Sequence, residues 1–172
     1  MKWPLFLIAL LLPLPAFALG LDRVNAAYDR YEQEVWLADM SRRLERRIPD
    51  ARERTELLHL VQREARRAGL PPELVLAVIQ VESNFDRWAI SRAGAVGLMQ
   101  VMPFWLGELG RPGDNLFHVP TNLRLGCTIL RHYLDMEKGN LIRALARYNG
   151  SLGSYRYPRR VLKALRTQWA VR

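Results

Sequence analysis

Helical periodicity constrains the fold of this chain more than any other feature. Apolar residues recur at the three- and four-residue spacing of amphipathic helices in one stretch after another. No stretch shows the apolar–polar alternation of a half-buried strand. The sequence therefore predicts an all-α fold, a compact bundle of short helices preceded by a long N-terminal amphipathic helix. The expected helices cover residues 22–47, 51–68, 72–83, 98–102, 120–136, 141–148 and 158–169.

Proline and glycine divide these helices from one another. Residues 84–92 and 104–119 lose the periodicity and are expected to be irregular, and residues 138–140 are expected to form a turn. A chain of 172 residues that is 49% hydrophobic fits one domain with an ordinary core. No internal repeat or second-domain linker is evident.

The first eighteen residues are typical of a signal peptide. Lys2 supplies a positive start, an apolar run covers Leu5 to Leu12, and Ala16-Phe17-Ala18 is a small-x-small cleavage signal. The apolar run is too short for a bilayer span, which needs about 20 residues. We expect cleavage near Ala18, export to the periplasm, and a single domain over residues 19–172 without a stable membrane anchor. An uncleaved anchor is the alternative.

A strong positive charge raises the question of a partner. The formal net charge is +9, with arginines in pairs such as Arg42-Arg43 and Arg159-Arg160. Nucleic acid is the usual partner of so basic a protein, but an exported protein rarely meets it. Anionic envelope polymers and lipid head groups remain as attractants, beside a solvated basic surface with no dedicated partner.

One ionisable residue lies where the helical pattern predicts an apolar one. At about 100° per residue, Glu82 projects into the sector shared by Val75, Val78 and Ile79. An apolar environment disfavours a carboxylate and raises its pKa, which suits a general acid. The structural alternative is a partly buried glutamate that accepts hydrogen bonds at a helix end.

A second catalytic carboxylate is hard to find. Glycosidases normally use two, and the nearest candidates are Asp86, Glu108 and Asp114. The sequence does not determine where any of these three side chains points.

Other catalytic chemistries find no support in the sequence. There is no HExxH motif, and the histidines at 59, 118 and 132 are scattered. The only cysteine, Cys127, cannot form an internal disulfide and is expected to be a small buried hydrophobe. No serine lies in a nucleophile elbow, and no glycine loop could bind phosphate. We expect neither a metal nor a cofactor.

Four ordered motifs resemble the soluble lytic transglycosylase domain family over about residues 55–165. They are Glu82-Ser83-Asn84-Phe85, the run from Gly94 to Pro103 (GAVGLMQVMP), Asn122-Leu123 with Gly126, and Ala144 to Gly150 (ALARYNG). The resemblance implies a lysozyme-like helical fold. It also implies cleavage of the peptidoglycan β-1,4 bond between N-acetylmuramic acid and N-acetylglucosamine, leaving a 1,6-anhydromuramoyl end.

The resemblance further implies roles for individual residues. Glu82 would be the single acid/base, because the C6 hydroxyl of the sugar replaces an activated water. Tyr148 matches the tyrosine whose hydroxyl approaches the catalytic carboxyl. The other expected substrate contacts are Ser91, Gln100, Met102 and Asn149. Met102 and Tyr148 could instead be packed core residues.

Two departures from the family pattern affect the expected substrate site. Phe104-Trp105 replaces the usual residues after the Met-Pro pair, and Gly150-Ser151 follows Tyr148-Asn149. Alternative functions are a hydrolytic lysozyme-like muramidase, a catalytically inactive peptidoglycan-binding module, and an electrostatic polymer binder. The expected partner is the glycan strand, with an envelope-spanning secretion or pilus apparatus as a further hypothesis and a monomer as the expected state.

Overall fold

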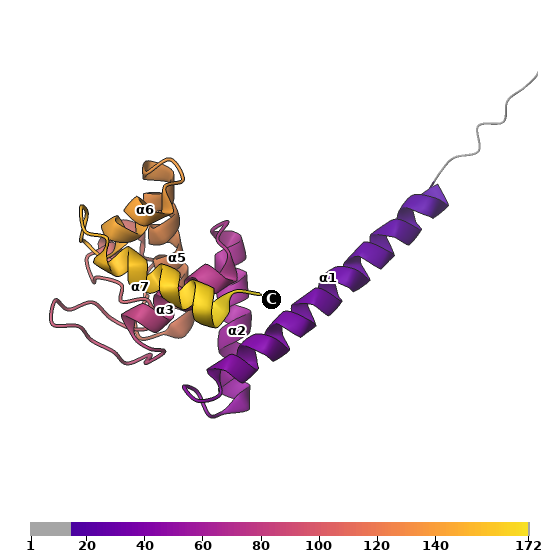
Figure 1. Ribbon diagram of the computed structural model, residues 1–172, viewed down its shortest axis with the longest axis horizontal. Helices are drawn as coiled ribbons and strands as arrows, with labels where there is room; N and C mark the ends of the chain where they lie inside the picture. Colours follow the sequence, from indigo (N-terminus) through magenta and orange to yellow (C-terminus); the bar gives the residue numbers. More distant parts are fainter. Residues whose placement is uncertain (1–14, 172) are drawn as a thin grey trace, which may run out of the picture. The chain divides into compact units, whose positions relative to one another are not determined.

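The computed structural model describes residues 15–171, and helices dominate this range (Figure 1). Within it, β-structure is limited to the isolated bridges Ile90–Val96 and Val96–Val101. The predicted all-α fold is confirmed. The helices are α1 (Pro15–Leu44), α2 (Ala51–Arg67), α3 (Pro72–Glu82), α4 (Trp105–Leu109), α5 (Val119–Met136), α6 (Leu141–Tyr148), α7 (Arg156–Ala164) and the π-helix η1 (Leu165–Trp169).

The chain divides into two units, at Trp36 and Leu37. The first unit contains the part of α1 up to Trp36, and Tyr28, Tyr31 and Val35 on it are exposed. Most of the predicted signal peptide, residues 1–14, lies outside the described residues. None of the helices searched in residues 15–171 combines the length and the apolar character that crossing a membrane requires.

The second unit is organised around α3. Every residue from Leu74 to Ile79 is buried, so this short helix is apolar on all sides. It contacts α2, α7 and η1 (Figure 1). At its carboxyl end, Gln80 Oε1 accepts a 2.7 Å hydrogen bond from the indole nitrogen of the fully buried Trp169. The helix that carries Glu82 is therefore held from several directions.

Local sequence signals account for the ends of the helices. Asp50 caps α2, because its carboxylate accepts a 2.7 Å hydrogen bond from the backbone N–H of Glu53. Asn140 caps α6 in the same way through the N–H of Arg143. Pro72 occupies the first turn of α3, where its missing N–H costs nothing.

The structure differs from the sequence prediction at four places. The first helix covers Pro15–Leu44 instead of residues 22–47. Residues 98–102 are not a short helix but part of a tight turn, because Gly97 and Gln100 both have positive φ angles. The segment 104–119, expected to be irregular, contains α4. The final helix begins at Arg156 and widens to a π-helix from Leu165.

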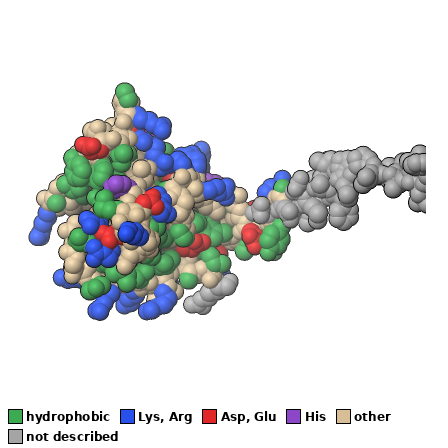
Figure 2. Space-filling model, turned by 90° about the horizontal axis from the view of Figure 1, so that it is seen from above, with side chains coloured by type: hydrophobic (Ala, Val, Ile, Leu, Met, Phe, Trp, Pro, Cys, Tyr) green, Lys and Arg blue, Asp and Glu red, His purple; other side chains and the backbone are tan. Residues whose placement is uncertain are grey.

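Basic side chains are spread widely over the second unit. On the face shown in Figure 2, Lys and Arg side chains lie at many separate places, with hydrophobic side chains between them. Several are paired with acids, as in the ion pairs Arg124–Asp114 and Arg147–Glu137. This distribution is that of a solvated basic surface on the face in view.

Candidate active site

Glu82 is the last residue of α3 and lies partly buried. Burial raises the pKa of its carboxyl from 4.5 to about 7. A hydrogen bond from Tyr157 and the positive charge of Arg160 act in the opposite direction and are smaller. Near neutral pH the carboxyl can therefore hold a proton and can also release it, as an acid/base must.

Tyr157 is the direct partner of Glu82. Its hydroxyl donates a 2.6 Å hydrogen bond to Glu82 Oε1, across 75 positions of sequence. The ring is only 5% exposed and lies in the second position of α7, where burial raises the pKa of its hydroxyl well above the usual value. A neutral phenol at this place orients the carboxyl and stabilises its ionised form.

No sequence motif indicates a role for Tyr157 in the site. A signal for its burial was present, because Tyr157, Val161 and Ala164 follow the four- and three-residue spacing of an inward helix face, and all three are buried. Nothing in that spacing pointed to Glu82. The contact depends on the packing of α7 against α3.

Tyr148, which matches the family tyrosine whose hydroxyl approaches the catalytic carboxyl, makes its hydrogen bond to the backbone. The hydroxyl donates a 2.7 Å hydrogen bond to the backbone carbonyl of Met99, and the hydrogen bond to Glu82 comes from Tyr157 instead. The pKa of Tyr148 is raised well above its usual value, mainly by burial, with a smaller contribution from the Glu82 charge. Tyr148 thus lies near Glu82 while it supports the turn at Met99.

The chain leaves α3 through a strained segment. Asn84 and Phe85 have φ angles of 49° and 71°, in the left-handed region that is unusual for a bulky residue such as Phe85. Phe85 is nevertheless buried, and its ring lies 5.5 Å from that of Trp169. The Ser83 hydroxyl donates a 2.8 Å hydrogen bond to the Leu98 carbonyl and so links the end of α3 to the turn that contains Leu98. Such strain is found where the surrounding packing fixes a functional geometry.

The side chain of Asn122 holds the turn of residues 96–101 in place through hydrogen bonds. This side chain is 1% exposed and donates to the carbonyls of Val96 and Leu116, while its oxygen accepts from the N–H of Met99 at 2.8 Å. Gly97 makes the approach possible, since a Cβ there would lie 2.5 Å from Asn122 Nδ2. The motif residue Asn122 therefore shapes the site without contacting Glu82.

Two of the expected substrate contacts hold the same loop in place. The Ser91 hydroxyl accepts a 3.0 Å hydrogen bond from the N–H of Ala95. Gln100 donates through Nε2 to the carbonyls of Ala89 and Gly97. The side-chain oxygen of Gln100 remains available to accept a hydrogen bond from a ligand.

The two remaining expected contacts lie at the surface of this region. Met102 is half-buried beyond the turn. Asn149 is exposed and ends α6. The side chains of both can be reached from solvent.

The three candidates for a second carboxylate show no interaction with Glu82. Asp86 is exposed and accepts a hydrogen bond from the N–H of Trp88 at 2.8 Å. Asp114 forms an ion pair with Arg124, and Glu108 is exposed on α4. None of the three is among the groups that shift the pKa of Glu82. Among the side chains that the structure describes, residues 26–28 and 30–171, no cluster of three from His, Cys, Asp or Glu could hold a metal ion.

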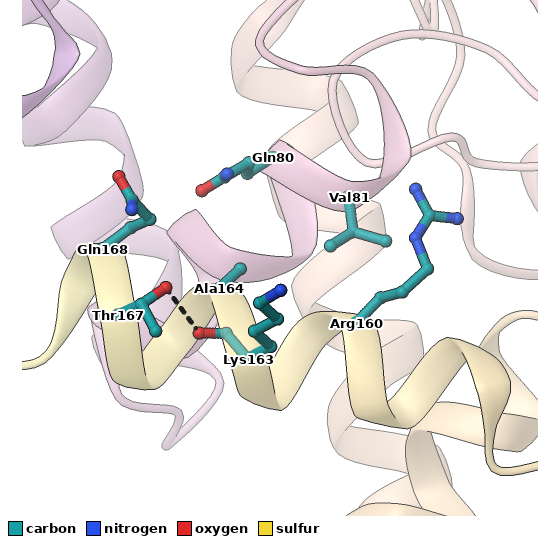
Figure 3. A pocket seen from close by; sticks show the side chains of 7 residues that line it. All are labelled: Gln80, Val81, Arg160, Lys163, Ala164, Thr167 and Gln168. Carbon is teal, nitrogen blue, oxygen red and sulfur yellow. Dashed lines mark hydrogen bonds between the residues drawn. The ribbon is translucent and has the colours of Figure 1, made fainter.

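A pocket of about 340 Å³ lies beside the end of α3 (Figure 3). Gln80 and Val81 line it from α3, and Arg160 and Lys163 line it from successive turns of α7. Of the two cations, only Arg160 lowers the pKa of Glu82. The pocket therefore places one positive charge within electrostatic reach of the carboxyl.

The fold and the isolated, partly buried carboxyl define an all-α, lysozyme-like domain. A family model for the transglycosylase SLT domain matches residues 59–167, well over half of the chain. The chain belongs to this family.

Relatives and solved structures agree with this assignment. Membrane-bound lytic murein transglycosylase C of Yersinia pestis (strain Pestoides F) is 34% identical in an alignment of 113 residues that covers 56% of this chain and 32% of the relative. The matched part thus spans about a third of the curated relative. An inactive mutant of the lytic transglycosylase Slt from Pseudomonas aeruginosa shares 31% identity with a TM-score of 0.53, over 66% of this chain and 19% of that one.

A further solved structure supports the fold alone. The 70 kDa soluble lytic transglycosylase from Escherichia coli has a TM-score of 0.50 at 23% identity, over 79% of this chain and 24% of that one.

Proposed function

We propose that this protein is a peptidoglycan lytic transglycosylase with Glu82 as its single acid/base. The bond cleaved is the β-1,4 bond between N-acetylmuramic acid and N-acetylglucosamine, and the product carries a 1,6-anhydromuramoyl end. The raised pKa of Glu82, with no second carboxylate among its perturbing neighbours, is the observation that carries the proposal. Membership of the SLT domain family supports it.

The proposed reaction uses Glu82 twice. The protonated carboxyl gives its proton to the glycosidic oxygen as the bond from that oxygen to C1 of the muramoyl residue breaks. The C6 hydroxyl oxygen of the same residue then bonds to C1, and the Glu82 carboxylate takes the hydroxyl proton. The proton balance closes without water, and Glu82 returns to its starting form. A pKa of about 7 suits both halves of this cycle.

The neighbouring residues have supporting roles in this proposal. Tyr157 is a positioning residue that fixes the direction of the Glu82 carboxyl and stabilises its charge between the two steps. Tyr148 holds the turn at Met99. The proposed substrate contacts are Ser91, Gln100, Met102 and Asn149.

The proposed location is the periplasm, after removal of residues 1–18 as a signal peptide. The protein would act there as a monomer on glycan strands and could open the wall for an envelope-spanning secretion or pilus apparatus. The last hypothesis rests only on small size and positive charge. Failure to co-purify with any component of such an apparatus would count against it.

Clearing of purified sacculi tests the proposed role of Glu82. We expect the wild type to clear them and Glu82→Gln to lose at least a hundredfold in rate, since general acid–base groups contribute about 10² to 10⁴. Asp86→Asn is the matched control, because it removes the nearest other carboxylate and still accepts from Trp88. An active Glu82→Gln variant, or an inactive wild type, would overturn the proposal.

A further inference from the structure

Three aromatic side chains, one exposed and two half-buried, form a contiguous group, and two of them directly follow the Met102-Pro103 pair. We call Phe104, Trp105 and Tyr133 the aromatic ridge. The ring centroids of Phe104 and Trp105 are 5.0 Å apart with planes 32° from parallel, and Trp105 meets Tyr133 edge-on at 6.3 Å. These are favourable geometries for aromatic pairs, so the rings hold one another in a fixed surface.

The ridge leaves much of its apolar surface in water. Phe104 is 60% exposed, Trp105 and Tyr133 are half-buried, and α4 has no buried residue. The indole N–H of Trp105 has no hydrogen-bond partner within residues 15–171, so a ligand can accept from it. Packing of the protein core does not account for this arrangement, whereas a ligand that covers a flat apolar surface would.

The ridge is continuous with the candidate active site. The N–H of Trp105 donates to the carbonyl of Met102 at 3.1 Å, which ties α4 to the turn. At the other side, Tyr133 contributes to the raised pKa of Tyr148, whose hydroxyl is bonded to Met99. Tyr133 therefore lies close to Tyr148, one of the residues around Glu82.

We propose that the aromatic ridge is a saccharide subsite that stacks against a pyranose ring of the glycan strand, away from the bond being cleaved. A pyranose presents C–H groups on its faces and hydroxyls at its edge. The C–H groups match the exposed ring of Phe104, and the hydroxyls can accept a hydrogen bond from the indole N–H of Trp105. This inference rests on the proposed function, because it takes the glycan strand as the substrate.

A subsite away from the bond being cleaved has a specific consequence. Short oligosaccharides that fill only the positions beside Glu82 do not reach the ridge, whereas longer ones do. The ridge should therefore add affinity for long strands and none for short ones. An aromatic contact of this kind is worth roughly three- to tenfold in affinity.

Binding of N-acetylglucosamine oligomers tests the subsite. Isothermal titration calorimetry with the dimer, tetramer and hexamer, on the Glu82→Gln protein to prevent turnover, gives the dissociation constants. We expect Phe104→Ala to weaken hexamer binding three- to tenfold and leave dimer binding unchanged, and Phe104→Tyr to restore it. Tyr28→Ala is the matched control, because Tyr28 is exposed to the same degree, 61%, and lies in the other unit.

The outcomes separate the subsite from the function. Equal hexamer affinity in the parent and in Phe104→Ala would overturn the subsite alone. A parent that binds none of the oligomers would overturn the subsite and count against the proposed function too. Equal weakening for the dimer and the hexamer would also overturn the subsite, since it would show a general disturbance of the site.

Discussion

The hydroxyl of Tyr157 donates a 2.6 Å hydrogen bond to Oε1 of Glu82 and joins the start of α7 to the end of α3. This bond favours the ionised carboxylate, whereas burial favours the protonated acid. Burial is the larger effect, and the pKa is about 7. The two residues together therefore set the protonation state that the proposed reaction needs.

Removing the Tyr157 hydroxyl is expected to raise the pKa of Glu82 further. In Tyr157→Phe the ring still fills its site, but the carboxylate loses its donor, so the proton is held to higher pH. We expect the rate of sacculus clearing to fall roughly ten- to hundredfold, as for the loss of a hydrogen bond to a charged group. The pH above which activity declines should move upward. A uniform loss without movement of the pH profile would indicate a structural role only.

Arg160 should influence the same pH profile through its charge. Arg160→Met removes the cation that lowers the pKa of Glu82, so activity should persist to higher pH than in the wild type. Lys163→Met is the control, because Lys163 lines the same pocket and does not contribute to that pKa. The difference between the two variants should shrink in high salt, which screens exposed charges. Identical profiles at low salt would contradict the electrostatic role.

Glu82 is expected to reduce the stability of the folded protein as pH rises. The folded pKa of about 7 exceeds the ordinary 4.5, so both states hold the proton below pH 4.5 and stability is then at its full value. Between pH 4.5 and 7 the unfolded state loses its proton first, and folding is increasingly disfavoured. Glu82→Gln does not titrate, so its free energy of unfolding should gain about 2–3 kcal/mol on the wild type between pH 4 and 8. Urea titrations that show a constant difference would contradict the raised pKa.

Gly97 should be required for the turn of residues 96–101. An alanine Cβ there would lie 2.5 Å from Asn122 Nδ2 and 2.8 Å from the Leu116 carbonyl, at a φ of +76°. We expect Gly97→Ala to lose roughly 2–5 kcal/mol of unfolding free energy, from the overpacking and the positive φ together. In the control Gly94→Ala, φ is +84° but nothing lies within 4 Å, so the loss should be about 1–2 kcal/mol. Equal losses in urea titrations would show that the close contact with Asn122 is not the cause.

Periodicity was sufficient to predict the helical scaffold and the candidate acid. The bounds of α6 match the expected helix, and α3 begins at Pro72 as expected. Glu82 lies at the end of α3 in a partly apolar setting, as its helical position indicated. These features depend on contacts among residues three and four apart, which the sequence displays directly.

Features that depend on contacts between distant residues could not be predicted in the same way. The partner of Glu82 is 75 residues away, and no local pattern indicates which tyrosine reaches it. The sequence predicts a helix over residues 98–102, whereas the structure has a turn there, because the positive φ of Gln100 is imposed by its surroundings and not by its residue type. Asn122 and Gly97 supply those surroundings from different parts of the chain.

The central claim, that Glu82 acts with the sugar's own hydroxyl and without water, is tested most directly by digestion of sacculi in ¹⁸O-labelled water. Mass spectrometry of the soluble products reads the muramoyl ends. The account predicts anhydro ends, one water lighter than reducing ends and free of ¹⁸O, that disappear with Glu82→Gln. Reducing muramoyl ends that carry ¹⁸O would contradict it and identify a hydrolase instead.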